Sequence, residues 1–330
     1  MLLSAFVSLW QKRKVWKKHK IMEIKVISVN ISKEKGTIKL PVDSIEINEK
    51  GVAGDAHSGY WNRQISLLAR ESMDKFGKEA RREFKPGEFA ENITTEGIAL
   101  HVTRPLDRFK IGETELEVTQ IGKGCHGDGC AIFREVGNCV MPKEGIFCRT
   151  ITGGRIGPGN SIEYIPKILR VYILTLSDRA FRGEYSDRSG PQTAKLTKEY
   201  FMQMGYESII ENEIIPDDAV ELRQKLVEAT NKGFDVIFTT GGTGIGPRDI
   251  TPDVTRTMLD KEIPGIMQNI RLKFGQEKPN ALLSRAVAGI IGSTLVFNMP
   301  GSVRAVEEYT GEIFKSIKHM IYMLHGLDLH

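Results

Sequence analysis

The chain has 330 residues, of which 40% are hydrophobic and 27% are charged. That length allows about two domains, and the composition excludes a disordered chain and a collagen-like fibre. No run of about 18 apolar residues occurs, so we expect no spanning membrane segment. Six of the 46 basic residues lie in the first twenty positions, which leaves 40 basic against 42 acidic residues elsewhere. The basic excess therefore belongs to a tail, which argues against nucleic-acid binding by a folded face.

Residues 1–21 are expected to form a basic, disordered extension. Its apolar part precedes its basic part, which is the reverse of a secretory signal. Two interpretations remain open: a short amphipathic segment on a membrane surface, or a stretch translated from upstream of a start at Met22, which we favour. Without an export signal, we expect a cytoplasmic protein.

All four cysteines, Cys125, Cys130, Cys139 and Cys148, lie within 24 positions of one another. Their spacing is not the paired C-x2-C of a zinc ribbon, and no export signal supports disulfides. We therefore expect free thiols. A cluster of this kind indicates a role that is local to this segment.

Residues 22–165 contain short β-branched runs separated by glycine-rich turns, which predicts a β-rich, barrel-like domain. A helix is expected over 69–84, interrupted at Gly77. The runs that we expect to be strands are KVISVNI, SIEI, QISLLA, ELEVTQIG, IFCRTIT and SIEYI.

Residues 168–330 alternate strand and helix patterns, which predicts an α/β domain with a mostly parallel sheet covered on both faces, a three-layer α/β/α architecture. The strands are expected at 168–176, 207–215, 234–240 and 293–301. The helices are expected at 191–205, 217–233 and 302–326, with a further one beginning near Pro252 that Thr251 or Asp249 would cap.

Ligands of open α/β sheets bind at the carboxyl ends of the strands, and these ends carry the unusual residues of this half. A glycine-rich loop lets backbone N–H groups approach phosphate oxygens, although its spacing is neither a P-loop nor a dinucleotide fingerprint. Asp217 and Asp249 suit Mg²⁺, which takes one or two carboxylates plus substrate phosphates; alternatively both simply cap helices. The candidate site comprises Ser177, Asp178, Asp217, Gly241, Gly242, Thr243, Gly244, Asp249, Pro300, Gly301 and Ser302.

Six ordered blocks of this half resemble the molybdopterin adenylyltransferase family of molybdenum cofactor biosynthesis. The blocks are LTLSDR (174–179), IPDD (215–218), TTGGTGIGPRDITPD (239–253), EIPG (262–265), LSRA (283–286) and NMPGS (298–302). The resemblance implies an enzyme, commonly trimeric, that transfers AMP from Mg-ATP to the terminal phosphate of molybdopterin and releases pyrophosphate. It implies that Asp217 and Asp249 are the functional carboxylates. The glycine loop and residues 300–302 would hold nucleotide and pterin phosphate, and Ser177 and Asp178 would line the pocket. Candidate charge partners, or alternatively surface side chains, are Arg179, Arg248 and Arg285.

The first half resembles a MOSC domain, a family related to the C-terminal domains of molybdenum cofactor sulfurases. The matching blocks are GDAH (54–57), WNRQISLL (61–68), GEFAENIT (87–94), CHGDGCA (125–131) and VMPKEGIF (140–147). The resemblance implies a reactive or metal-ligating cysteine, best matched by Cys130 and next by Cys125. A thiolate suits sulfur transfer or molybdenum, and His126 would lower its pKa. Candidate pocket residues are Asp55 and His57, whereas Cys139 and Cys148 are expected to be buried hydrophobes.

These observations predict a two-domain enzyme of molybdenum cofactor biosynthesis that acts on molybdopterin and ATP and forms a homo-oligomer. The alternative is a non-enzymatic carrier or scaffold that binds the cofactor without turnover. A nucleotide-binding regulator unrelated to the cofactor is disfavoured, because both halves resemble families of the same pathway. Paired carboxylates beside a phosphate loop favour the enzyme, since a carrier does not need them.

Overall fold

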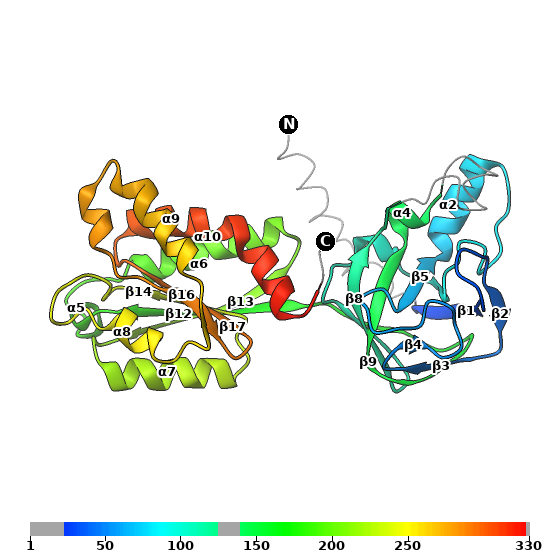
Figure 1. Ribbon diagram of the computed structural model, residues 1–330, viewed down its shortest axis with the longest axis horizontal. Coiled ribbons are helices and arrows are strands. Elements are labelled where there is room, and N and C mark those ends of the chain that lie inside the picture. Colours follow the sequence, from blue (N-terminus) through cyan, green and yellow to red (C-terminus); the bar gives the residue numbers. More distant parts are fainter. Residues whose placement is uncertain (1–22, 125–138, 328–330) are drawn as a thin grey trace. The chain divides into compact units, whose positions relative to one another are not determined.

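The computed structural model describes residues 23–124 and 139–327, which form two compact units that divide between Lys167 and Ile168 (Figure 1). Each unit has its own buried hydrophobic core. Within the described ranges, no helix has both the length and the apolar content that a membrane span requires.

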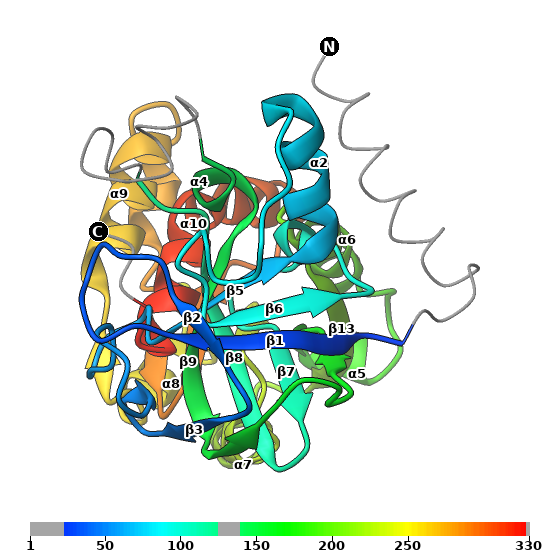
Figure 2. The same cartoon turned by 90° about the vertical axis from the view of Figure 1, so that its right-hand side faces the viewer.

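The N-terminal unit is built on an eight-stranded sheet in the order β11-β7-β8-β9-β5-β6-β1-β2, with a second sheet in the order β10-β3-β4. In Figure 2, β1, β6 and β5 lie side by side below α2, and β2 pairs with β1. The curled, strand-rich sheet confirms the predicted β-rich, barrel-like class. Its elements are β1 (Lys25–Ile31), β2 (Leu40–Val42), β3 (Ile45–Asn48), β4 (Gly51–Val52), β5 (Ile65–Ala69), α2 (Arg70–Ala80), β6 (Ile93–Glu96), η1 (Leu100–Val102), β7 (Arg108–Ile111), β8 (Thr114–Ile121), α4 (Met141–Glu144), β9 (Ile146–Thr152), β10 (Gly154–Ile156) and β11 (Glu163–Ile165).

Helix α2 continues through Gly77, so the expected interruption is wrong. A glycine inside a helix costs only about 1 kcal/mol relative to alanine, and the burial of Met73 and Phe76 on the same helix offsets that cost. The absence of a side chain at Gly77 instead lets the chain turn closely past this residue where the helix ends. Arg81 takes the left-handed conformation there, and a Cβ on Gly77 would lie 2.7 Å from the carbonyl oxygen of Arg82.

The C-terminal unit contains a six-stranded sheet in the order β13-β12-β14-β17-β16-β15, of which the first four strands are parallel. Helices α6, α9 and α10 cover one face and α7 and α8 the other, which confirms the three-layer α/β/α prediction (Figure 1). Its elements are β12 (Ile168–Leu176), α5 (Asp178–Phe181), α6 (Ser189–Gln203), β13 (Glu207–Ile215), α7 (Ala219–Asn231), β14 (Val236–Thr240), α8 (Thr251–Arg256), β15 (Lys261–Glu262), α9 (Pro264–Gly275), η3 (Pro279–Leu283), β16 (Ala288–Ile291), β17 (Thr294–Met299) and α10 (Val303–Leu324).

The two antiparallel strands at the far edge of this sheet were not expected from the sequence. Strand β16 forms a hairpin with β17, in which Ile291 pairs with Thr294 across the two-residue turn Gly292-Ser293. Gly292 has a φ of 58°, which glycine adopts without strain. A Gly-Ser pair between two apolar runs is a hairpin signal, so the sequence contained evidence for this turn.

Candidate active site at the carboxyl ends of the parallel strands

Four neighbouring parallel strands end at the same edge of the C-terminal sheet. Strands β12, β13, β14 and β17 end at Leu176, Ile215, Thr240 and Met299. Because parallel strands point the same way, their carboxyl ends open onto one crevice. The structure therefore brings the residues that follow each strand to a common edge, as the sequence predicted.

Gly241 joins three of these strand ends through close backbone contacts. Its N–H donates to the carbonyl oxygen of Met299 at 2.9 Å, and a Cβ on Gly301 would lie 3.3 Å from its Cα. Gly241 has a φ of 101°, and a Cβ there would lie 2.3 Å from the carbonyl oxygen of Leu176. Only glycine fits this position, so the backbone at the base of the crevice is packed without side chains.

Asp178 and Asp217 hold the ends of β12 and β13 together by two reciprocal hydrogen bonds. The N–H of Asp178 donates to Oδ2 of Asp217 at 3.2 Å, and the N–H of Asp217 donates to Oδ1 of Asp178 at 3.1 Å. The other oxygen of Asp178 forms an ion pair with Arg248. Burial raises the pKa of Asp217, and the negative charges of Asp178 and Asp249 raise it further. The single guanidinium of Arg248 only partly offsets this excess negative charge.

Asp249 folds the glycine loop back on itself. Its Oδ2 accepts a hydrogen bond from the N–H of Gly246 at 2.7 Å, and its own N–H donates to the Gly246 carbonyl oxygen at 3.1 Å. A Cβ on Gly244 would lie 2.8 Å from the same Oδ2. The loop therefore needs glycine where it passes the carboxylate, which places backbone amides and a charged oxygen within a few ångströms of one another.

Neither Thr251 nor Asp249 caps helix α8, which begins without a side-chain cap. The prediction is wrong because both side chains bond to the glycine loop instead: Oγ1 of Thr251 donates to the Gly241 carbonyl oxygen at 3.0 Å. Helix α7 is capped by Asp218, whose Oδ1 accepts from two N–H groups of the first turn, and not by Asp217. The interpretation of Asp217 and Asp249 as the caps of the helices that follow them is therefore also wrong.

The two predicted binding serines both cap helices at this edge. Oγ of Ser177 accepts from the N–H of Ala180 at 3.3 Å, and Oγ of Ser302 accepts from the N–H of Ala305 at 3.2 Å. Ser302 thereby starts the 22-residue helix α10 directly after Gly301. A long helix that begins beside a glycine loop presents N–H groups and a positive dipole end to an anion.

The three candidate arginines all have partners within the C-terminal unit. Arg248 pairs with Asp178, and the guanidinium of Arg179 lies 5.2 Å from the ring centre of Tyr185. Nε of Arg285 donates to the Gly244 carbonyl oxygen at 2.7 Å. In this structure they therefore support the loops of the crevice.

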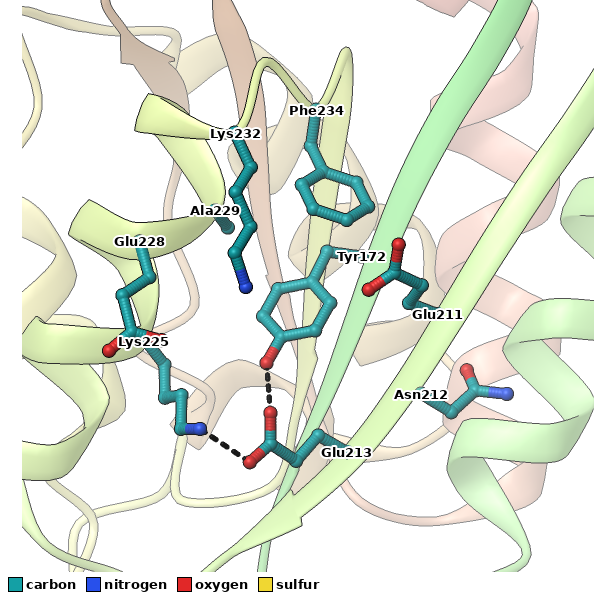
Figure 3. Close-up of a pocket in the computed structure, with 9 residues that line it drawn as sticks. All are labelled: Tyr172, Glu211, Asn212, Glu213, Lys225, Glu228, Ala229, Lys232 and Phe234. Atoms are coloured by element: carbon teal, nitrogen blue, oxygen red, sulfur yellow. Dashed lines mark hydrogen bonds and ion pairs between the residues drawn. The ribbon is translucent and has the colours of Figure 1, made fainter.

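A cavity of about 170 Å³ lies elsewhere in this unit, between β12, β13 and α7 (Figure 3). Glu213 in its wall accepts hydrogen bonds from the Tyr172 hydroxyl and from Nζ of Lys225. Burial, followed by the bond to Glu213, raises the pKa of Tyr172. None of the predicted site residues lines this cavity, so it is separate from the candidate site. Its lining residues are Tyr172, Glu211, Asn212, Glu213, Lys225, Glu228, Ala229, Lys232 and Phe234.

In the N-terminal unit, the candidate residues Asp55 and His57 lie together around a buried lysine. Lys39 forms an ion pair with Asp55, and each of the two side chains is 1% exposed. Nδ1 of His57 lies 3.5 Å from Nζ of Lys39, and the imidazole is 30% exposed. Burial opposes ionisation of Asp55, but hydrogen bonds from His57, Lys39 and Ser32 outweigh it and hold its pKa well below the ordinary value. Sequence reasoning missed Lys39, because lysine is almost never buried and no local pattern marks it.

Glu91 is a second buried ionisable group of this unit that sequence reasoning did not single out. Its Oε1 accepts hydrogen bonds from the N–H of Gly87 at 2.6 Å and from the hydroxyl of Thr94 at 2.9 Å. Its Oε2 is buried without a hydrogen-bond partner. Burial raises the pKa of Glu91, which favours the neutral acid.

Cys139 and Cys148 are both buried, as predicted. Cys148 is fully buried, and burial raises the pKa of its thiol. Cys125, His126 and Cys130, which the sequence marks as the candidate reactive group, lie outside the described residues.

Two family models match the chain. The model described as "Probable molybdopterin binding domain" matches residues 172–319, and the MOSC domain model matches residues 54–163. The first match contains the crevice residues from Ser177 to Ser302, and the second contains Asp55, His57 and Glu91.

Curated relatives match about half of the chain. A molybdopterin adenylyltransferase of Pyrococcus furiosus is 39% identical over 163 residues, which is 47% of this chain and 92% of the relative. Gephyrin of Dictyostelium discoideum is 36% identical over 162 residues, but this covers only 22% of gephyrin. The match to cinnamon, a molybdenum cofactor synthesis protein of Drosophila melanogaster, covers 25% of that protein at 37% identity. The chain thus spans about a quarter of the length of these two large relatives.

A solved structure described as the tungsten cofactor synthesizing protein MoaB from Pyrococcus furiosus is 36% identical to the chain. The match covers 48% of this chain and 98% of the chain in that structure, with a TM-score of 0.43. The family model and the nearly full-length match to the Pyrococcus adenylyltransferase together establish the protein family of the C-terminal half. The chain is a member of the molybdopterin-binding domain family of molybdenum cofactor biosynthesis and carries a MOSC domain ahead of that domain.

Proposed function

We propose that the C-terminal unit is a molybdopterin adenylyltransferase, which transfers AMP from Mg-ATP to the terminal phosphate of molybdopterin. The observation that carries the proposal is the meeting of Asp217, Asp249 and the glycine loop at one edge of the sheet, beside the start of helix α10. This arrangement supplies both negative oxygens for a cation and N–H groups for phosphates.

The reaction that this arrangement suits needs no protein nucleophile. An oxygen of the molybdopterin phosphate forms a bond to the α-phosphorus of ATP, and the bond from that phosphorus to the oxygen bridging to the β-phosphate breaks, which releases pyrophosphate. The protein has to hold two anions, ATP and the molybdopterin phosphate, close together. It also has to stabilise the negative charge that develops on the oxygen of the leaving pyrophosphate. The N–H groups of the glycine loop and of the first turn of α10 suit that task, apart from those of Gly246 and Ala305, which donate to Asp249 and Ser302.

The residues present fit a bound Mg²⁺. Burial is the main cause of the raised pKa of Asp217, and the carboxylates of Asp178 and Asp249 add negative charge around it, which a divalent cation would neutralise. Among the described residues, no three Asp, Glu, His or Cys side chains gather as a complete metal site. A magnesium ion would be held by Asp217, Asp249 and substrate phosphates, where it would offset phosphate charge during transfer.

The test is pyrophosphate release from Mg-ATP in the presence and absence of molybdopterin. Release that requires both compounds supports the transferase. Tight binding of molybdopterin without pyrophosphate release contradicts it and favours the carrier or scaffold.

We further propose that the MOSC unit handles the molybdenum or sulfur of the cofactor through the thiolate of Cys130. We expect Cys130 to be the first of the four cysteines alkylated at neutral pH, because reactivity follows the thiolate fraction and exposure. Cys139 and Cys148 should react slowly, since both are buried. Timed alkylation with peptide mapping measures the order, with and without bound cofactor. Labelling of Cys125 before Cys130 would show that Cys130 is not the reactive thiol. Labelling of all four cysteines only after denaturation would show that none of them is a reactive thiol in the folded protein.

We propose that residues 22–165 and 168–330 are domains that fold independently, because each unit has its own core and the units divide at Lys167. A fragment that begins at Lys167 should therefore be soluble, unfold cooperatively and release pyrophosphate at a rate similar to that of the full chain. Circular dichroism melting and the pyrophosphate assay check this. A folded fragment that binds ligand but has lost turnover would show that the two halves form one functional unit.

A further inference from the structure

Arg285 contacts four separate points of the segment that runs from Thr243 to Asp253, which comprises the glycine loop and the first residues of α8. Its backbone N–H donates to the Thr243 carbonyl oxygen at 2.8 Å, and its Nε donates to the Gly244 carbonyl oxygen at 2.7 Å. Nη2 donates to the carbonyl oxygen of Asp249, and Nη1 lies 2.8 Å from both carboxylate oxygens of Asp253. Every guanidinium nitrogen thus has a partner in this segment.

The peptide of Arg285 is itself held by two helices. Nη1 of Arg271, on α9, donates to the carbonyl oxygens of Ser284 and Ala286, which flank Arg285, at 3.3 and 3.1 Å. The hydroxyl of Tyr309, on α10, donates to Oγ of Ser284 at 2.9 Å. Arg285 is therefore anchored to the packed helical layer, and its side chain extends that anchor to the loop.

The loop needs an external anchor of this kind. Two of its first four residues, Gly244 and Gly246, are glycines, and glycine loses more conformational freedom on ordering than any other residue. The loop's own backbone supplies few constraints, chiefly the turn from Gly246 to Asp249 and the bond from the Thr251 N–H to the Gly242 carbonyl oxygen at 3.1 Å. A planar guanidinium can bond several carbonyl oxygens in fixed directions, whereas a lysine ammonium is a compact point charge on a flexible chain.

We propose that Arg285 is a positioning residue that presets the phosphate loop and the backbone of Asp249, and that it is not a ligand of the phosphates. This inference rests on the proposed adenylyl transfer but assigns Arg285 a role different from charge neutralisation. Small errors in the placement of reacting groups reduce the reaction rate strongly, since a displacement of about 1 Å can lower the rate roughly 100-fold. The carbonyl oxygens that the Arg285 side chain binds belong to Gly244 and Asp249, which lie five residues apart in the sequence of the loop.

The test compares Arg285→Lys and Arg285→Met with the wild-type full chain and with Arg256→Lys. Arg256 is a half-exposed arginine that pairs with Glu262 and serves as the matched control. If Arg285 positions the loop, both Arg285 variants should lose roughly 100-fold in kcat for pyrophosphate release, because lysine cannot span the acceptors. If Arg285 instead neutralised phosphate, lysine would preserve most of the rate, and that outcome would overturn the proposal. In Arg285→Ala, free guanidinium should restore more turnover than ammonium at equal concentration, and equal restoration by both ions also counts against positioning.

Amide hydrogen exchange gives a readout that does not depend on turnover. The Thr251 amide and its neighbours in 243–253 should exchange at least about tenfold faster in both Arg285 variants, with the rest of α8 and the sheet unchanged. Unchanged exchange in this segment overturns the proposal even if activity falls. If the wild type releases no pyrophosphate, the adenylyltransferase proposal fails, while the exchange comparison still decides whether Arg285 orders the loop.

Discussion

Replacing Asp249 by asparagine should reduce adenylyl transfer by roughly 100- to 1,000-fold while leaving the fold and molybdopterin binding intact. Asparagine keeps an oxygen that can accept from the N–H of Gly246, so the turn of the glycine loop should survive. It removes the negative charge, however, and a neutral amide cannot offset the charge of Mg²⁺ beside the phosphates. Pyrophosphate release at saturating Mg-ATP and molybdopterin measures the effect. Thermal unfolding and molybdopterin titration measure fold and binding.

The matched control for this substitution is Asp218→Asn, one residue from Asp217 in the same strand-to-helix connection. Asp218 caps α7, and asparagine is as good an N-cap as aspartate, so activity and stability should change little. Asp217→Asn should resemble Asp249→Asn. Wild-type turnover in Asp249→Asn would show that this carboxylate does not hold the metal, and equal loss in Asp218→Asn would indicate a general effect of removing charge.

Lys39→Met should destabilise the N-terminal unit by about 3–5 kcal/mol, the largest effect on folding that we expect from a single substitution. It leaves Asp55 buried and charged without its lysine partner, and both side chains are almost inaccessible to water. Urea unfolding followed by tryptophan fluorescence measures the change in the free energy of unfolding. All three tryptophans of the chain precede residue 62, and Trp61 is the one within the described residues, so the signal does not come from the C-terminal unit.

The double variant Lys39→Met/Asp55→Asn is the control, because it removes both charges and should recover part of the lost stability. The wild type should also show a matching dependence on pH. The pKa of Asp55 is lower in the folded protein, so its contribution is present above about pH 4 and is lost as the pH falls further and the carboxyl is protonated. Lys39→Met with wild-type stability would show that the ion pair contributes nothing net to folding.

Much of the C-terminal architecture follows from local sequence patterns. Strands β12 and β13 have the bounds that the sequence predicts. Strand β12 is a nearly continuous apolar run, as a buried parallel strand requires, whereas β13 lies at the edge of the sheet and is partly polar and exposed. The position of the site follows from the same patterns, since parallel strands end together and the residues after them must meet. The glycine loop, Asp217 and Asp249 therefore could be assigned to one edge before any contact was known.

The tertiary structure decided which partner each side chain takes. Thr251 and Asp249 have the residue types of helix caps, but the folded glycine loop offers them closer partners. Arg285 reaches Gly244 and Asp249 across more than thirty residues, and Lys39 meets Asp55 between segments that only the sheet brings together. Local patterns depend on spacing along the chain and so reveal helices, strands and their ends. The choice among several hydrogen-bond or ionic partners depends on burial and distance in three dimensions, which only the packed fold defines.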